Sequence, residues 1–274
     1  MTKPLPIAIV IPHGGLAIPP ELQGHILLTE EQIFNEADVY VDAIYDFRER
    51  VLHWVSFPYA RALIDVNRPA ENAQHHRPGD GVVKRQTSYG APVFAQGKEP
   101  DPEFEQKLIQ QYWQPWHDQL ARIASDDRVK LVLDCHSMAA IGPSTYDDPS
   151  QIRPRITASN LGDAKGNATS INPTLSASAE LTRSLADELG MALATISDLA
   201  PTEAQSAVNT PFWGGVNIAM HGGKLQPWVM LELNRGLYIG AQTGDSPVVP
   251  PDTTLFATIR EQIWSAIEKI AADL

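Results

Sequence analysis

The chain has 274 residues, 43% of them hydrophobic, which is enough for a sizeable core in one α/β domain spanning 1–274. Its formal net charge of −12 argues against nucleic acid and anionic membrane surfaces as partners, because both favour basic patches. One cysteine, no signal-peptide pattern and no apolar run of membrane-spanning length indicate a cytoplasmic protein. We expect a monomer or a homodimer.

Strand-like and helix-like segments alternate along the chain. Apolar runs of strand length predict strands, and apolar residues at helical spacing predict helices. The expected strands are 7–11, 55–57, 62–64, 129–133, 191–196 and 228–231. The expected helices are one that starts after a cap at Thr29, then 38–51, 104–123, 177–190 and 255–274, with polar loops at 71–97, 141–173 and 209–223. This alternation predicts the α/β fold class.

Three of the expected strands end in side chains that can bind a metal or a proton. His13 follows the first strand, His136 and Ser137 follow the strand at 129–133, and Glu232 follows the strand at 228–231. Open α/β sheets build their sites at the carboxyl edge of the strands. Two histidines and a glutamate at such an edge suggest a catalytic zinc site with its general base.

Zinc hydrolases commonly hold the ion with two histidines and one carboxylate. His13 and His136 supply the histidines, and Asp38, near the start of a predicted helix, fits best as the carboxylate, with Glu36 as the nearby competitor. We interpret five other histidines as surface or loop residues, with the pair His75–His76 as a weak second metal candidate: His25, His53, His75, His76 and His117.

Glu232 ends an apolar strand, where an uncompensated carboxylate is costly. One interpretation is a buried structural glutamate paired with Arg235 or Arg68. The other is a general base with a pKa raised by burial, which takes a proton from water and passes it to the leaving amine.

Arg61 and Arg68 bracket the predicted strand at 62–64, with Asn67 beside Arg68. Guanidinium groups match carboxylates in two-point geometry, so this pair suits a small anionic substrate in spite of the acidic net charge. An ordinary ion pair between Arg68 and Asp65 is the alternative.

Several segments together resemble the N-formylglutamate amidohydrolases. They run in family order from residue 12 to residue 238: Pro12-His-Gly-Gly15, Asp38–Phe47, Arg61–Pro69, Asp134–Met138, Asn209–Gly215 and Leu231–Tyr238. The zinc carboxypeptidases and succinylglutamate desuccinylases are similar more distantly. The resemblance implies a mixed, twisted, phosphorylase/hydrolase-like sheet with helices on both faces.

The resemblance also implies zinc, or another divalent transition metal, on His13, Asp38 and His136. It implies Glu232 as the base and Arg61 as the group that polarises the scissile carbonyl. Asn67 and Arg68 would hold the substrate carboxylate, and the matching segments add further substrate-binding candidates: Ser137, Asn209, Gly214 and Gly215. The implied reaction converts N-formyl-L-glutamate to formate and L-glutamate in histidine degradation.

The sequence departs from these families at two places. Carboxypeptidases carry their acidic ligand three residues after the first histidine, where this chain has Leu16. Family members often carry a threonine-arginine pair in the region that here reads Asn217 to His221. If that arginine reads the second carboxylate, another N-acyl amino acid is the substrate. A metallo-carboxypeptidase and a non-catalytic anion-binding module are the alternative functions.

Overall fold

The computed structural model describes residues 3–70, 80–272 and 274, so the His75–His76 candidate lies outside the described residues. Six strands form one mixed sheet in the order β2-β1-β3-β6-β4-β5. They are β1 (Leu5–Ile11), β2 (Val51–Ser56), β3 (Leu131–Met138), β4 (Ile156–Ser159), β5 (Ser206–Val208) and β6 (Trp228–Asn234). The first four strands in this order are parallel, while β4 runs antiparallel to β6 and parallel to β5.

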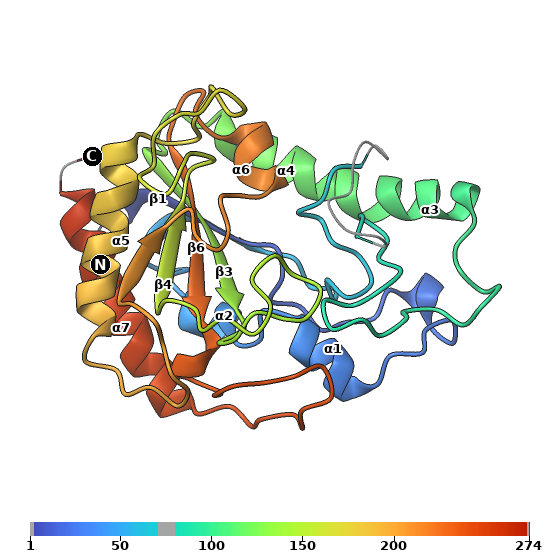
Figure 1. Ribbon diagram of the computed structural model, residues 1–274. Helices are drawn as coiled ribbons and strands as arrows, with labels where there is room; N and C mark the ends of the chain where they lie inside the picture. Colours follow the sequence, from blue (N-terminus) through green and yellow to red (C-terminus); the bar gives the residue numbers. More distant parts are fainter. Residues whose placement is uncertain (1–2, 71–79, 273) are drawn as a thin grey trace.

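Helices cover both faces of the sheet, as predicted (Figure 1). The helical segments are η1 (Pro20–Leu22), α1 (Glu30–Glu36), α2 (Val41–Ile44), α3 (Pro102–Leu108), η2 (Ile109–Trp113), α4 (Gln114–Ala124), α5 (Ala179–Leu193), α6 (Val216–His221), η3 (Arg235–Leu237) and α7 (Thr253–Ala271). Within the described residues no helix is both long and apolar enough to cross a membrane.

The side chains of β1 show how the two cores form. Ile7, Ile9 and Ile11 join one apolar cluster with α2, α5 and α7, whereas Ala8 and Val10 join a second cluster with α4 and residues 57–66. Alternate residues of a strand point to opposite faces, so a sheet covered on both sides needs a continuous apolar run.

The parallel strands bring their carboxyl ends to one edge of the sheet. In the register of β3 and β6, His136 lies opposite Glu232. Both strands continue further than predicted, to Met138 and Asn234, so the two side chains belong to the strands instead of following them.

The predicted helix at 38–51 is wrong. Tyr40 has φ 66°, which no continuing right-handed helix allows, and only the single turn α2 is helical before the chain enters β2 at Val51. The helical spacing of apolar residues there reflects burial of a looped segment in the core.

Two predicted strands are also wrong. Residues 62–64 form a turn, in which Leu63 N and Ile64 N both donate to Ala60 O. Residues 191–193 continue α5, because Gly190 does not end that helix but lies against Ser206, where a Cβ atom would crowd the Ser206 side chain.

The polar stretches that we predicted as loops hold two further elements, β4 and α6. The reading of His53 and His117 as surface or loop residues also needs correction, since His53 lies in β2 and His117 is buried on α4. The helix cap at Thr29 is confirmed, with a reciprocal capping box to Gln32. The helix predicted at 104–123 is confirmed as the consecutive segments α3, η2 and α4.

Candidate functional site

A cavity of about 650 Å³ opens at the carboxyl edge of the parallel strands. It collects all but one of the predicted site residues: His13, Asp38, Arg61, Asn67, Arg68, His136, Ser137, Gly214, Gly215 and Glu232. Asn209 does not line this cavity. Its side chain instead bonds to Asn160 and to the carbonyl of Asp163, which fixes the loop after β4.

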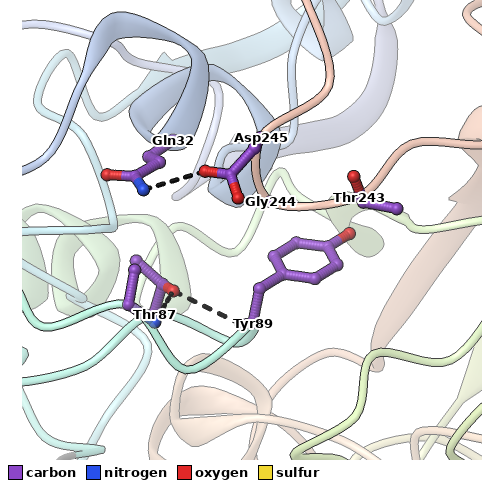
Figure 2. Close-up of a pocket in the computed structure, with 7 residues that line it drawn as sticks. Gln32, Thr87, Tyr89, Thr243, Gly244 and Asp245 are labelled. Carbon is purple, nitrogen blue, oxygen red and sulfur yellow. Dashed lines mark hydrogen bonds between the residues drawn. The ribbon is translucent and has the colours of Figure 1, made fainter.

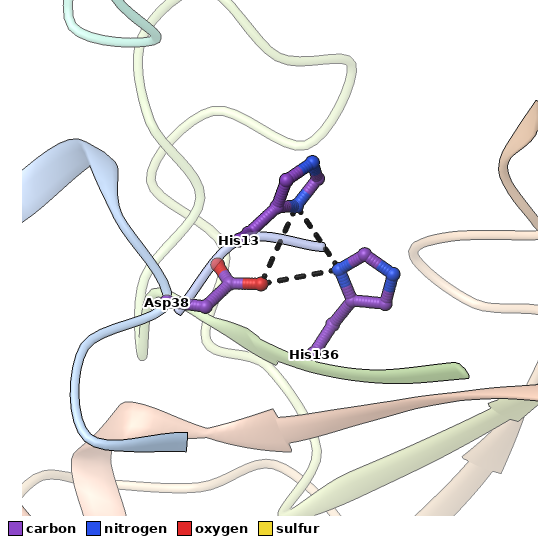
Figure 3. A group of neighbouring side chains, drawn as sticks. All are labelled: His13, Asp38 and His136. Carbon is purple, nitrogen blue, oxygen red and sulfur yellow. Dashed lines mark hydrogen bonds and ion pairs between the residues drawn. The ribbon is translucent and has the colours of Figure 1, made fainter. Parts of the chain in front are cut away.

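Two histidines and an aspartate that line the cavity point toward one another (Figure 3). Asp38 Oδ2 lies 3.1 Å from His136 Nδ1 and 3.5 Å from His13 Nδ1, and the two Nδ1 atoms are 3.1 Å apart. All three side chains are buried. One nitrogen from each histidine and one carboxylate oxygen therefore converge on a common point.

The outer nitrogen of each histidine faces an acidic partner. His13 Nε2 donates to Asp65 Oδ1 at 2.7 Å, and His136 Nε2 lies 3.4 Å from Asp134 Oδ2. Such carboxylates fix the tautomer of a metal-binding histidine and raise its basicity. With the protons on Nε2, both Nδ1 atoms present lone pairs to each other and to Asp38.

This donor set fits a divalent transition metal. Three lone-pair donors 3.1–3.5 Å apart repel one another unless a proton or a cation lies between them. Two imidazole nitrogens and one carboxylate oxygen are ligands that zinc takes in catalytic sites, with a further position left open. Burial raises the pKa of Asp38, but without a metal ion the two histidines, when protonated, donate hydrogen bonds and supply positive charge that outweigh burial and hold this pKa well below its usual range.

Of the two candidate carboxylate ligands, Asp38 lies in the cluster and Glu36 does not. The Glu36 carboxylate accepts from Ser88 N at 2.8 Å and from Lys84 Nζ at 3.3 Å, and it is not part of the cluster. Asp38 is placed by its own backbone, since Asp38 N donates to His13 O at 3.0 Å.

Glu232 lies buried on β6 beside the cluster, with 7% of its surface exposed. Among the described residues its carboxylate makes no hydrogen bond or ion pair, so the predicted pairing with Arg235 or Arg68 is not present. Burial and the negative charge of Asp38 raise the pKa of Glu232 to about 7, against the opposing positive charges of His136 and Arg61. A carboxyl group of this kind can exchange a proton near neutral pH.

Arg61 and Arg68 lie on one wall of the cavity and share an acidic anchor. Arg61 Nη2 donates to Asp65 Oδ2 at 3.0 Å, and Arg68 Nη1 lies 3.7 Å from the same oxygen. Arg68 Nε also donates to Asp80 at 3.0 Å. The ion pair of Arg68 with Asp65 exists, but it does not remove the arginine from the cavity.

Close approach of the backbone explains Gly215, one of the remaining candidates. Gly215 caps α6 where any Cβ atom would collide with the Asn67 amide, and Asn67 Oδ1 accepts from Asn217 N at 2.8 Å. Ser137 Oγ is buried and has no hydrogen-bond partner among the described residues.

Sequence reasoning did not assign a functional role to Asp65, Asp134, Asn217 or Arg235. Asp134 had a usable signal, because residues two apart on a strand point to the same face and it therefore accompanies His136. Asn217, in contrast, reaches Asp134 Oδ1 at 3.1 Å from a different element, and no local pattern marks that contact.

A second, smaller cavity of about 220 Å³ lies between α1 and the loop near Gly244 (Figure 2). Gln32 Nε2 donates to Asp245 there at 2.9 Å, and Tyr89 lines this cavity as well as the large one. It contains none of the predicted site residues.

The fold and site define a class: an α/β protein whose parallel strands bring two histidines, a carboxylate and a buried glutamate to one sheet edge. The model of the N-formylglutamate amidohydrolase family matches residues 5–239, so the chain belongs to that family. The resemblance inferred from the motifs is confirmed.

A curated relative, the N-formylglutamate deformylase of Pseudomonas putida, is 27% identical over 168 residues. That match covers 59% of this chain and 60% of the relative, so the chain aligns with about three fifths of the relative's length.

Two solved structures share the fold. One is an N-formylglutamate amidohydrolase from Ralstonia eutropha, with a TM-score of 0.72 at 18% identity, covering 100% of this chain and 96% of its own. The other is a gene product of Agrobacterium tumefaciens, with a TM-score of 0.57 at 14% identity, covering 97% of this chain and 92% of its own. The mixed-sheet fold predicted from the motifs is thereby confirmed.

Proposed function

We propose that this protein is a zinc-dependent amidohydrolase that converts N-formyl-L-glutamate and water to formate and L-glutamate. The observation that carries the proposal is the convergence, in one cavity, of a metal-type cluster with Glu232. The pKa of this carboxyl group is raised to about 7, and Glu232 forms no ion pair with any of the described residues. Family membership supports the same substrate.

His13, His136 and Asp38 would hold the ion. Bound there, zinc would supply Lewis acidity that polarises the formyl carbonyl and makes a water molecule easier to deprotonate. Glu232 takes the proton from the attacking water and returns it to the amide nitrogen as the C–N bond breaks. Arg61 stabilises the negative charge that develops on the carbonyl oxygen.

Arg68 and Asn67 hold a substrate carboxylate, and Ser137, Gly214 and Gly215 line the same cavity. The proposed setting is histidine degradation in the cytoplasm, as a monomer or homodimer. The single cysteine, Cys135, is buried in the core, which suits a reducing compartment.

The test is formate release from N-formyl-L-glutamate by the purified protein before and after metal removal, together with elemental analysis. We expect about one zinc ion per chain, and activity that is lost on chelation and restored by zinc. His136→Ala should lose both metal and activity.

The control is His25→Ala, which removes an exposed loop histidine that is not part of the cluster and should change neither value. Equal metal content in the wild type and His136→Ala would contradict the site. Release of C-terminal residues from short peptides, without formate release, would favour a metallo-carboxypeptidase.

A further inference from the structure

Arg235 is a buried cation that forms no ion pair with a carboxylate in the part of the chain that the structure describes. It follows β6 in η3, only 6% of its surface is exposed, and it lines the large cavity. No carboxylate among the described residues lies within ion-pair distance of its guanidinium. A buried charge without a counter-charge is strongly unfavourable, so this side chain is set up to receive an anion.

The other arginines of the cavity differ from Arg235 in this respect. Arg61 is paired with Asp65 at 3.0 Å, and Arg68 is paired with Asp80 at 3.0 Å. Arg153 makes a two-point pair with Asp148 at 2.7 and 2.8 Å. Arg235 is thus the one described guanidinium of this cavity whose charge no protein carboxylate balances.

Arg235 also has a structural contact. Its Nη1 donates to Asn35 O and Ala37 O, both at 2.9 Å, where α1 ends and the chain turns toward Asp38. These bonds fix the position of the guanidinium group, but both acceptors are neutral carbonyl oxygens that leave its charge unbalanced. Arg235 Nε remains buried with no hydrogen-bond partner.

The surroundings of Arg235 suit an incoming anion. The nearby Tyr89 hydroxyl is buried and has no partner among the described residues, so it is a second available donor on the cavity wall. Burial raises the pKa of Tyr89 against the charge of Arg235, which keeps the hydroxyl protonated. Two acids whose charges act on Arg235 are already engaged, Glu36 by Lys84 and Ser88 and Asp38 by the histidines.

We propose that Arg235, with Tyr89, binds the second carboxylate of a dicarboxylate substrate, the side-chain carboxylate of an N-acyl acidic amino acid. This rests on the proposed function, in which Arg68 holds the first carboxylate. It also supplies an arginine to this cavity, whereas the segment from Asn217 to His221 contains none. The two carboxylates then contact different walls, one formed by the segment after Ile64 and one by the turn after β6.

The test compares kcat/KM for N-formyl-L-glutamate with that for N-formyl-L-glutamine, a neutral substrate of the same shape. The wild type should prefer the glutamate. Arg235→Gln keeps a donor for the α1 carbonyls but removes the charge, and it should reduce the preference about 10²-fold. Most of the change should be in KM, because the carboxylate is present in both ground and transition states.

Arg155→Gln is the matched control. Arg155 Nη1 donates to Leu193 O and Ile196 O after α5, the same kind of contact that Arg235 makes after α1, but Arg155 does not line the cavity. This variant should keep the preference. If Arg235→Gln lowers kcat/KM equally for both substrates, Arg235 only holds the end of α1 and the proposal is overturned.

Two further measurements keep the test decisive. Arg235→Lys keeps the charge without the planar guanidinium and should show a preference between those of the wild type and Arg235→Gln, about 10-fold below the wild type. A folded Arg235→Gln that keeps the wild-type preference also overturns the proposal. If the wild type hydrolyses neither substrate, the proposed function fails, and calorimetric binding of L-glutamate and L-glutamine then tests Arg235 alone. Tighter glutamate binding that is lost in Arg235→Gln supports the proposal, and a preference that persists contradicts it.

Discussion

Arg61 and Arg68 share the Asp65 carboxylate, yet we assign them different tasks. Arg68→Ala should raise KM more than it lowers kcat, because the carboxylate that it holds does not change during the reaction. Arg61→Ala should mainly lower kcat, by about 10²–10³-fold, since the charge on the carbonyl oxygen grows toward the transition state. Steady-state kinetics of both variants measure this split.

Arg50→Ala is the control for the arginine pair, because Arg50 makes a surface ion pair with Glu261 outside the cavity. It should leave both constants unchanged. The opposite pattern, with kcat lowered by Arg68→Ala and KM raised by Arg61→Ala, would show that the two assignments are inverted.

Asp65 acts through His13. Asp65→Asn removes the charge that orients the His13 ring and raises its basicity, so metal affinity should fall about 10–100-fold. Competition with a coloured chelator measures it. Asp126→Asn is the control, because His53 and Asp126 form a second histidine–aspartate pair, 2.8 Å apart and outside the cavity. This variant should leave metal affinity unchanged. Equal affinities for Asp65→Asn and wild type would refute this role.

At the residue level, the sequence indicated the side chains whose local setting is unusual. Glu232 and His136 stood out because charged groups rarely end apolar runs. Arg235 and Asp65 carry no such signal, because their contacts lie more than 50 residues away in the chain. Asp65 bonds to His13, and Arg235 bonds to the backbone carbonyl of Asn35. Three-dimensional contacts alone show that Asp65 bonds to a histidine and that Arg235 forms no ion pair with an acid among the described residues.

At the level of elements, two buried histidines join α4 to α6. His117 Nε2 donates to Val66 O at 2.8 Å, so its Nδ1 is an acceptor, and His221 donates to that Nδ1 at 3.0 Å. Both rings must be neutral for this arrangement. Burial lowers the pKa of both histidines. The positive charge of Lys224, and that of His117 when it is protonated, add to burial and lower the pKa of His221 to about 4.

The pair should make the protein less stable in mild acid. In the unfolded chain these histidines bind protons below about pH 6.5, while in the folded chain His221 resists protonation until about pH 4. The free energy of unfolding is therefore highest above pH 6.5 as far as His221 is concerned. It falls by on the order of 2–3 kcal/mol as the pH decreases toward 4 and His221 becomes protonated in the unfolded chain. Urea unfolding at several pH values measures the loss.

His221→Gln should flatten this pH dependence, because a glutamine can still donate to His117 but does not titrate. His25→Gln is the control, since an exposed histidine is solvated in both states. If His221→Gln keeps the full wild-type slope between pH 6.5 and 4, the neutral pair is not the cause.

Helices were predicted well where one buried face gives the apolar residues a clear helical spacing, as in 104–123 and 255–274. They were predicted poorly where tertiary contacts decide the backbone. Tyr40 takes a left-handed conformation that breaks the expected helix, and Gly190 lies inside a helix because Ser206 approaches it. The four residues of β4 are too few to show a strand period, and their pairing with β6 defines them.

At the scale of the whole molecule, the parallel arrangement of β1, β3 and β6 creates the site. It gathers His13, His136 and Glu232, which span more than 200 residues of sequence, at one edge of a sheet that is rigid because both faces are buried. This convergence could be predicted, because carboxyl ends of parallel strands meet at one edge. The antiparallel β4 and the α4–α6 packing that supports Asn217 could not.

The most direct test of hydrolysis at this edge is the turnover of N-formyl-L-glutamate by Glu232→Gln. Glutamine keeps the shape of the side chain but cannot accept the proton. We expect a folded variant that retains its metal and binds L-glutamate about as well as the wild type, with kcat reduced about 10²–10⁴-fold. A folded, metal-loaded Glu232→Gln with near-normal kcat would contradict it and remove Glu232 from the reaction.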